Sequence, residues 1–380
     1  MKRFFDHINI LVIPTNVCNL KCEYCFHNEY MSDDYGSNNM SYEMLERIFS
    51  ITFPYYKTVN IIWHGGEPLC MGLEFYKKVV ELQKQCNNNG TIVRNSIQTN
   101  MTLMTPQIAC FLKENNFDVS TSYDGIINEK LRHNTEDFWR GKQIYEEFAG
   151  KCGLIMVVSK ENINYLIESY EEFKNKKINY IMNPYTKSLN DKNDKLEISG
   201  KEYADKIIQF FEYWMYDKTC NIHVKYFQEI VEYMLFGKKS KCNVNSCLGK
   251  WVCVRPNGDV TPCNRHFPEK YSFGNIFEMK DIGESFDSKG FELLLSQAIA
   301  RRNKCKECSI YEYCAGGCNN IALVYGGVEN NNHEMCKALK IIYEHIEIQI
   351  KKIINDDVKT INPFLRRIII KYKNSVVDSI

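Results

Sequence analysis

Hydrophobic positions in the first half of the chain follow two alternating periods. Short apolar runs typical of strands cover Ile8–Ile13, Val59–Trp63, Ile92–Gln98, Val119–Ser122, Gly153–Val158 and Ile178–Met182. Between them, apolar residues recur at helical spacing over Tyr42–Phe53, Leu73–Gln85, Pro106–Asn115, Phe138–Phe148 and Ile163–Phe173. Thr105 before Pro106 predicts a helix cap, and Pro256–Asp259 predicts a hairpin-type turn. Strands that alternate with helices predict an α/β fold with a parallel sheet and right-handed crossovers. The carboxyl ends of such strands are where a functional site is expected.

The alternation ends near Asn183, and a polar stretch rich in Asn and Lys follows. Helical patterns then return at Lys201–Tyr216, Lys225–Phe236 and Lys337–Ile354. We therefore expect an α/β domain over residues 1–184, a helical linker region over 185–240, a cysteine-rich domain over 241–340, and a C-terminal helix and tail over 341–380.

Composition and charge exclude several classes of protein. The 380 residues are 44% hydrophobic and 25% charged, which is ordinary for a globular protein. A net charge of +1 gives no electrostatic reason to expect nucleic-acid binding. The sequence has no apolar run long enough for a membrane span and no signal peptide, so we expect a soluble, cytoplasmic protein. Its seventeen cysteines then indicate metal or redox chemistry, because the cytosol keeps thiols reduced.

Three of these cysteines, Cys18, Cys22 and Cys25, form a C-x3-C-x2-C run directly after the first predicted strand. A structural zinc site is one interpretation, but zinc usually takes four ligands in two separated pairs. Three thiolates in one loop suit three corners of an iron–sulfur cube and leave the fourth iron open to a small molecule.

The spacing, the position at a strand end and Tyr24 before the last cysteine resemble the radical S-adenosylmethionine (radical SAM) superfamily. The resemblance implies a partial (β/α)6 TIM-like barrel and SAM bound at the open iron. It also implies reductive cleavage of SAM to a 5′-deoxyadenosyl radical that takes a hydrogen atom from the substrate. The electron would come from a donor such as flavodoxin or ferredoxin.

The same resemblance assigns contacts to SAM at other strand ends. The segment Gly65-Gly66-Glu67-Pro68 resembles the part of the family that binds the SAM amino group, Ser122 resembles a ribose contact and Arg132 a carboxylate contact. We also expect Gln98 and Asn100, at the end of the third strand, to lie at the cofactor. Taken singly, each of these residues is more often found in a turn or at the surface, and Glu67 also suits an acid that caps a helix. Their shared location at strand ends favours a functional role.

Eight further cysteines in the C-terminal half resemble the SPASM extension of radical SAM enzymes. The resemblance implies two auxiliary [4Fe–4S] clusters and therefore three clusters in all. The first would be held by Cys242, Cys247, Cys263 and Cys318, and the second by Cys305, Cys308, Cys314 and Cys336. Two zinc ions would also use eight cysteines, so the spacing by itself leaves zinc open.

The family that the whole chain most resembles is the anaerobic sulfatase-maturating enzymes, which oxidise a Cys or Ser of a sulfatase to formylglycine. The helix start at Gly72–Phe75 and the Gln98–Asn100 element contribute to the resemblance. One position departs from the family, whose catalytic base is an Asp directly after the cysteine matching Cys263. Here that position is Asn264, and an amide cannot take up a proton near pH 7. His266, two residues on, is a weaker substitute.

We therefore expect a radical SAM/SPASM oxidoreductase that acts on a peptide or protein substrate. Oxidation or crosslinking of a residue in a ribosomally made peptide, for example through a thioether, is the main hypothesis. Sulfatase maturation is the alternative within this class. A non-catalytic scaffold that binds zinc or iron–sulfur clusters is the alternative outside it, and such a scaffold would bind no SAM.

Overall fold

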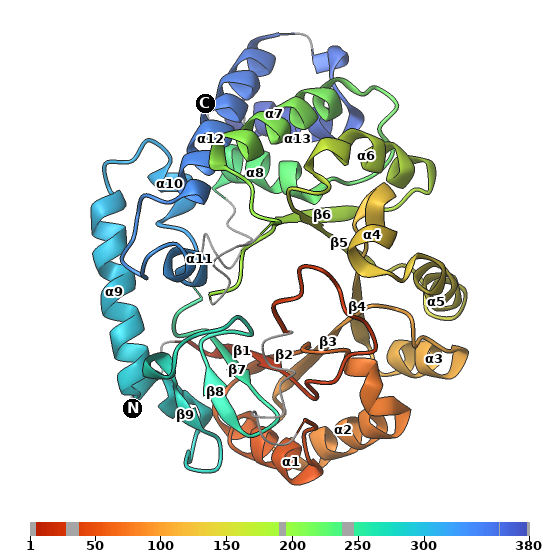
Figure 1. Cartoon of the computed structure of the whole chain (residues 1–380), viewed down its shortest axis with the longest axis vertical. Coiled ribbons are helices and arrows are strands. Elements are labelled where there is room, and N and C mark those ends of the chain that lie inside the picture. Colours follow the sequence, from red (N-terminus) through yellow and green to blue (C-terminus); the bar gives the residue numbers. More distant parts are fainter. Residues whose placement is uncertain (1–4, 28–37, 190–194, 238–246, 357, 378–380) are drawn as a thin grey trace. The chain divides into compact units, whose positions relative to one another are not determined.

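A computed structural model describes residues 5–27, 38–189, 195–237, 247–356 and 358–377. The chain divides into two compact units. The first comprises Met1–Ser122, Asn128–Gly153 and Cys247–Ser296, and the second comprises Tyr123–Ile127, Leu154–Ser246 and Gln297–Ile380. Each unit thus combines an early and a late stretch of the chain. In Figure 1, each unit therefore contains colours from well-separated parts of the colour bar.

The first unit is built on a sheet of parallel strands. Its order is β4-β3-β2-β1-β7-β8-β9, with β8 and β9 antiparallel to their neighbours. The bounds are β1 His7–Val12, β2 Thr58–Trp63, β3 Ile92–Thr99, β4 Phe117–Ser122, β7 Trp251–Val254, β8 Asp259–Thr261 and β9 Gly274–Asn275. The sequence predicted the first four strands, and the hairpin turn Pro256–Asp259 lies between β7 and β8 as expected. The pairing of β7 with β1 carries the late segment onto the early sheet.

The helices of the first unit pack beside these strands. They are α1 Tyr42–Ser50, α2 Gly72–Cys86, α3 Pro106–Glu114, α4 Asn128–Arg132 and α5 Thr135–Phe148. Figure 1 shows α1, α2 and α3 along one side of β1–β4. Side chains that alternate along β2 fill the core, including the fully buried Val59, Ile61 and Trp63.

The boundaries of two helices show how local residues set them. The pattern predicted that α1 would continue to Phe53, but it ends at Ser50. The 3-10 helix Phe53–Tyr55 follows instead, because Pro54 has no N–H with which to continue the α-helical hydrogen bonds. At α3 the predicted cap is confirmed, since the Thr105 hydroxyl accepts a hydrogen bond from Ile108 N at 3.2 Å.

The second unit contains a parallel strand pair, β5 and β6, and a group of helices. Their bounds are β5 Gly153–Val158, β6 Tyr180–Pro184, α6 Leu166–Asn175, α7 Gly200–Tyr216, α8 Lys225–Phe236, α10 Tyr311–Cys314, α11 Asn319–Val324, α12 Glu334–Asn355 and α13 Pro363–Val377. Helix α9, Lys289–Cys305, begins in the first unit and ends in the second. Apolar faces of α7 and α12 pack together, with Phe211, Trp214 and Ile346 among their fully buried side chains.

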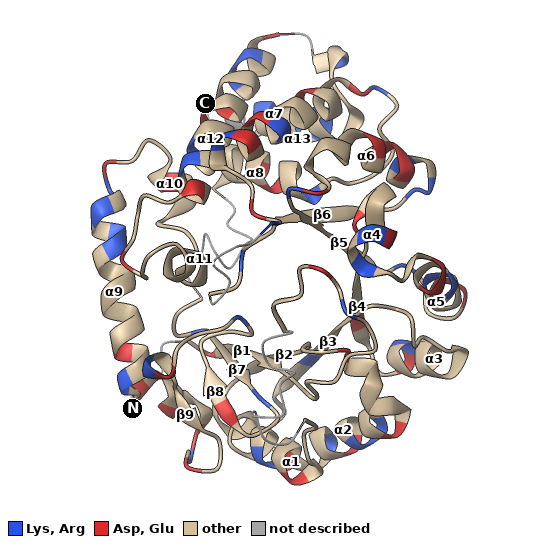
Figure 2. Cartoon of the chain, in the orientation of Figure 1, with Lys and Arg blue, Asp and Glu red and all other residues tan. Residues whose placement is uncertain are grey.

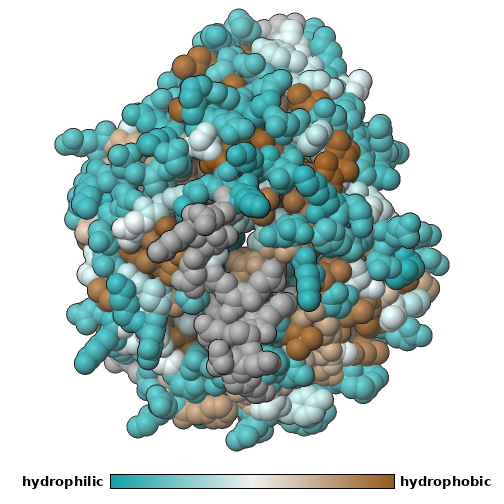
Figure 3. All heavy atoms as spheres, in the orientation of Figure 1, coloured by the Kyte–Doolittle hydropathy of each residue, from teal (hydrophilic) through white to brown (hydrophobic). Residues whose placement is uncertain are grey.

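The surface is polar over most of the face seen in Figure 3, with apolar residues scattered singly. Such scatter is usual for a protein exposed to water. Among the helices that the structure describes, none has both the length and the apolar composition to cross a bilayer.

Candidate active site

The loop of Cys18, Cys22 and Cys25 begins where β1 ends, and the segment after β2 holds its first residues. Gly66 N donates to Thr15 O at 3.1 Å, and Glu67 N donates to Val17 O at 2.9 Å. A Cβ atom on Gly66 would lie 2.2 Å from Val17 O, so only glycine allows this approach. The two strand extensions therefore meet directly before Cys18.

Glu67 joins the end of β2 to the end of β3 and is only 2% exposed. Its Oε1 accepts from Leu69 N at 3.0 Å and from Thr99 Oγ1 at 2.7 Å, while Oε2 accepts from Asn100 N at 2.7 Å. Burial raises the pKa of this carboxyl, and the three hydrogen bonds oppose that rise. The capping role considered from sequence is therefore confirmed, since Glu67 caps the 3-10 helix Pro68–Met71. A contact with the SAM amino group stays a prediction.

The cysteine loop is also tied to the end of β3 through its own Asn19. Asn100 Nδ2 donates to Asn19 Oδ1 at 2.9 Å, and Asn19 Nδ2 donates to Thr102 Oγ1 at 2.7 Å. Thr102 Oγ1 in turn donates to Asn100 Oδ1 at 2.7 Å, which closes a ring of three side chains. Asn100 was predicted from its strand-end position. Sequence reasoning missed Asn19, because nothing in the motif separates it from the other residues between the cysteines.

Tyr24 and Arg132, predicted from separate motifs, lie against each other. Arg132 Nη1 donates to the Tyr24 hydroxyl at 2.6 Å, and the guanidinium carbon lies 5.9 Å from the ring centroid. Beside them, Glu23 N donates to Leu131 O at 3.0 Å and binds the cysteine loop to α4. Arg132 is mostly buried, at 8% exposure.

Gln98 and Ser122 are joined across the neighbouring strands β3 and β4. Gln98 Nε2 donates to Ser122 Oγ at 2.9 Å, and Ser120 Oγ donates to Gln98 Oε1. Both predicted residues are half-buried at the carboxyl ends of their strands. The first unit thus brings the strand-end residues to one edge of its sheet, as the α/β pattern predicted.

The three N-terminal thiols form one electrostatic group. Burial is the main reason that the pKa of the Cys18 thiol is raised to about 12; Glu67, Cys25 and Cys22 contribute to the rise, and a hydrogen bond from Leu20 N opposes it. Thiols so placed need a bound cation to become thiolates, because metal binding displaces their protons. This arrangement fits an iron–sulfur centre with three protein ligands.

Asn264 contacts an imidazole rather than a carboxylate. Its Nδ2 lies 3.5 Å from His64 Nδ1, which also accepts from Gly65 N at 2.7 Å. Burial and the nearby Arg265 lower the pKa of His64 to about 4, so the ring is neutral near pH 7. With Nδ1 accepting, the proton of the neutral ring is assigned to Nε2. His64 was missed from sequence, although its place directly before Gly65 at the end of β2 was a usable signal.

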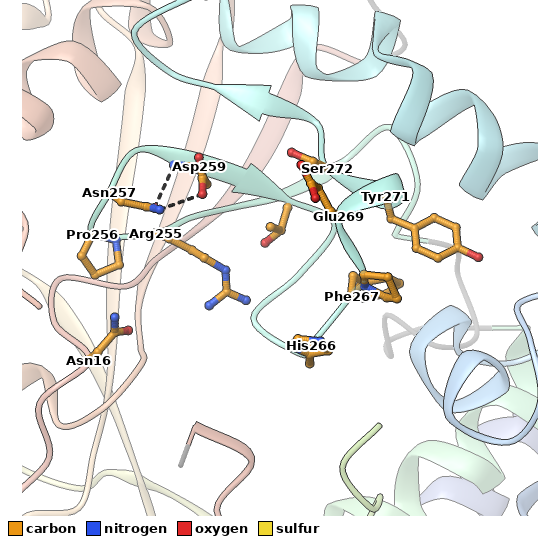
Figure 4. A pocket seen from close by; sticks show the side chains of 12 residues that line it. Asn16, Arg255, Pro256, Asn257, Asp259, His266, Phe267, Glu269, Tyr271 and Ser272 are labelled. Carbon is orange, nitrogen blue, oxygen red and sulfur yellow. Dashed lines mark hydrogen bonds between the residues drawn. The ribbon is translucent and has the colours of Figure 1, made fainter. Parts of the chain in front are cut away.

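His266 lies in a cavity of about 360 Å3 within the first unit. Figure 4 shows Arg255 and His266 reaching into this cavity and Asn16 at its edge. Burial and Arg255 both lower the pKa of His266. His64 and His266 therefore both favour the neutral form.

The auxiliary cysteines fall into both units. Cys247 and Cys263 belong to the first unit and Cys318 to the second, while Cys242 lies outside the described residues. Their common role as ligands of the first auxiliary cluster stays a prediction.

The other four auxiliary cysteines all lie in the second unit and interact with one another. The pKa of the Cys314 thiol is raised to about 12, mainly by burial and in part by Cys336, Cys305 and Cys308. Cys336 is affected in the same way by Cys305 and Cys308, and Cys305 by Cys308. Every pair among the four thiols is therefore within electrostatic reach.

The described residues contain no group of three or more His, Cys, Asp or Glu side chains arranged around a single metal ion. An iron–sulfur cube places its thiolates at separate corners, farther apart than the ligands of one ion. His333, the cap of α12, contacts one of these cysteines. Its Nδ1 accepts from Cys336 N at 3.2 Å, and its Nε2 lies 3.2 Å from Cys336 Sγ. A ring with this tautomer donates N–H to the sulfur, as outer-shell partners of metal ligands do.

Two family models match the chain in the regions where these cysteines lie. The radical SAM superfamily matches residues 12–173, and the SPASM iron–sulfur cluster-binding domain matches residues 242–309. The chain is a radical SAM/SPASM enzyme. Its cofactors are therefore SAM and iron–sulfur clusters, and the scaffold alternative is set aside.

Curated relatives of this radical SAM/SPASM enzyme include sulfatase maturases and one synthase. A cysteine-type anaerobic sulfatase-maturating enzyme of Clostridium perfringens is 28% identical, with 82% of this chain and 88% of the relative covered. A serine-type enzyme of Bacteroides thetaiotaomicron is 27% identical, with 90% of each covered. The radical SAM cyclopropyl synthase TigE of Paramaledivibacter caminithermalis is 23% identical, with 92% and 76% covered.

The solved structure of native anSMEcpe with bound AdoMet has the same fold. It gives a TM-score of 0.80 at 25% identity and covers 92% of this chain and all of the other. Another structure of that protein contains AdoMet and the Cp18Cys peptide, with the same TM-score and identity. The predicted fold class, a partial α/β barrel with a SPASM domain, is confirmed.

Proposed function

We propose that this radical SAM/SPASM enzyme oxidises or crosslinks a residue in a ribosomally made peptide or protein. The observation that carries the proposal is Asn264, an amide in contact with the neutral His64 where a sulfatase maturase needs a carboxylate. The similarity to a cyclopropyl synthase supports chemistry other than formylglycine formation. A radical reaction that closes a new bond requires different proton acceptors from one that forms an aldehyde.

Three [4Fe–4S] clusters complete the proposal. Cys18, Cys22 and Cys25 would hold the cluster that binds SAM, and the eight cysteines of the SPASM region would hold two auxiliary clusters. When bound, SAM and its cluster supply the radical that removes hydrogen from the substrate. A small electron-transfer protein, such as flavodoxin or ferredoxin, would deliver the electron.

The protein's own residues would position the reactants. Gly66 allows the backbone to hold the cysteine loop, and Glu67 locks the ends of β2 and β3. Arg132 is held beside the cysteine loop by its hydrogen bond to Tyr24. Its guanidinium cation suits the carboxylate of SAM. The amide of Asn264 can hold a substrate group by hydrogen bonds without exchanging a proton.

Sulfatase maturation is the second candidate function, and its support is the set of relatives of both cysteine and serine type. This function needs a proton acceptor other than Asn264. His64 is a poor base, because its pKa is about 4 and Gly65 N already occupies Nδ1. His266, which lines the cavity beside Arg255, is the substitute base that the sequence offers.

One experiment separates the two functions. The protein and its Asn264→Asp variant are reconstituted without oxygen and incubated with SAM, a reductant and a peptide carrying a sulfatase motif. We expect both to release 5′-deoxyadenosine, and only the variant to convert some peptide to formylglycine, seen as a mass change. Efficient conversion by the parent protein would favour sulfatase maturation and assign His266 as the first base to test.

A further inference from the structure

Among the described residues of the second unit, one arginine is fully buried. Arg301 lies in the last turns of α9 with 0% of its surface exposed. Its Nε donates to Gly316 O at 2.8 Å, and its Nη2 donates to Asn319 Oδ1 at 2.6 Å and to Gly317 O at 3.3 Å. Its Nη1 donates to Val328 O. All of these acceptors are neutral oxygen atoms.

The guanidinium group of Arg301 is thus hydrogen-bonded, but no carboxylate among the described residues neutralises its charge. Moving a cation out of water is costly unless an anion lies close to it. Burial lowers the pKa of Arg301, and the groups that oppose this are the thiols of Cys318, Cys305 and Cys336. Cys318 is a predicted ligand of the first auxiliary cluster, whereas Cys305 and Cys336 are both predicted ligands of the second. These cysteines become anions when they bind iron. They are the counter-charge that the buried guanidinium lacks.

The fold of the backbone places Arg301 beside the predicted cluster ligands. Arg301 stands four residues before Cys305 on α9, so both lie on the same side of the helix. Two of its carbonyl acceptors, Gly316 O and Gly317 O, belong to the turn between Cys314 and Cys318. Residues 315, 316 and 317 of that turn all have positive φ, at 48°, 85° and 70°. This conformation is one that glycine adopts easily, and it leaves the two glycine carbonyls bonded to the guanidinium.

We propose that Arg301 is the built-in counter-ion of the cluster held by Cys305, Cys308, Cys314 and Cys336, and that it raises the reduction potential of that cluster. The inference rests on the cluster assignment in the proposed function. Reduction adds an electron, and therefore negative charge, to the cluster. A buried cation stabilises the reduced form more than the oxidised form, and weak screening in the interior makes this effect large. Figure 2 shows several basic residues towards the end of α9. One of them, Lys304, is exposed and provides a control.

The test uses the full chain with Cys18, Cys22 and Cys25 changed to Ala, so that only auxiliary clusters contribute signals. Redox titrations followed by electron paramagnetic resonance then compare this background with Arg301→Gln and Arg301→Lys. For Arg301→Gln we expect the ratio of reduced to oxidised cluster at a fixed potential to fall about tenfold. That corresponds to a midpoint about 59 mV lower for a one-electron couple. Arg301→Lys keeps the charge, so its midpoint potential should move by less than about half of that amount.

The matched control is Lys304→Gln, which removes the same charge from an exposed position on the same helix. Water screens that charge, so we expect Lys304→Gln to shift the midpoint potential clearly less than Arg301→Gln does. An unchanged midpoint in Arg301→Gln would overturn the proposal, as would an equal shift in Arg301→Lys. If Arg301→Gln loses the cluster, iron content decides: retention by Arg301→Lys supports a charge role, and equal loss in both variants overturns it. A background protein without auxiliary iron would instead refute the cluster assignment itself.

Discussion

Replacing Gly66 by alanine tests how the cysteine loop is held. The added methyl carbon would lie 2.2 Å from Val17 O, 2.7 Å from Val17 C and 2.9 Å from Asn16 C. All three are backbone atoms, so no change of rotamer can relieve the overlap. The extensions of β1 and β2 must move apart, which weakens the hydrogen bonds from Gly66 N to Thr15 O and from Glu67 N to Val17 O.

The size of the effect follows from this overlap. Overpacking of this kind costs about 1–3 kcal/mol of folding free energy. For a large domain that corresponds to a fall in melting temperature of roughly 2–10 °C. Because Cys18 directly follows Val17, the displacement also moves the first ligand of the N-terminal cluster. We expect Gly66→Ala to lose about four irons per chain and most of its SAM cleavage.

The assay combines three measurements on protein prepared without oxygen: iron and sulfide per chain, 5′-deoxyadenosine formed with dithionite, and the melting temperature. The control is Gly153→Ala at the start of β5. There the atom nearest to the new Cβ would be Ser120 Cβ, at 3.6 Å. That substitution should leave iron content and SAM cleavage unchanged. If Gly66→Ala behaves like Gly153→Ala in all three measurements, the close contact with Val17 does not hold the loop and the reasoning is wrong.

Three further predictions concern other parts of the chain. Changing Cys18, Cys22 and Cys25 together to Ala should abolish 5′-deoxyadenosine formation and leave about 8 irons per chain, and parental SAM cleavage by that variant would refute the ligand assignment. The pKa of His64 in the folded protein, about 4, lies below its value of 6.5 in the unfolded chain, so falling pH protonates the unfolded chain first and destabilises the parent. Between pH 7.5 and 5.5 the parent should lose about 1 kcal/mol more stability than His64→Gln in urea unfolding, and parallel losses would contradict a buried neutral ring. Thr105→Ala removes the cap of α3 and should cost about 1 kcal/mol of folding free energy with full iron content, whereas loss of iron would show that α3 supports the cluster loop.

Features set by neighbouring residues were readable from the sequence. The alternating hydrophobic periods predicted β1–β6 and most of the first helices, because side-chain burial on a strand or helix repeats with a fixed spacing. The cap at Thr105 and the turn Pro256–Asp259 depend on a few adjacent residues and were predicted for the same reason. Boundaries were less certain, as the early end of α1 before Pro54 shows.

The contacts that build the site join residues far apart in the chain, so periodicity did not reveal them. Asn264 meets His64 across 200 positions, and Asn100 meets Asn19 across 81. The sequence placed Asn264 after a cluster cysteine but gave no sign that its neighbour is a neutral imidazole. The same limit applies to Arg301, whose position on α9 was not predicted to be buried.

The sequence by itself indicated the class of this protein, because its cysteine runs and strand-end motifs resemble those of radical SAM and SPASM enzymes, and strand–helix alternation specifies a parallel sheet. It also determined which residues stand at the strand ends. Tertiary structure alone decided how those residues are used. Glu67 is a clamp between two strands, Tyr24 binds Arg132, and Arg301 carries a charge into the interior because helix α9 and the turn after Cys314 fold against each other. Burial and charge are properties of the packed chain, since both depend on which distant residues exclude water from a group.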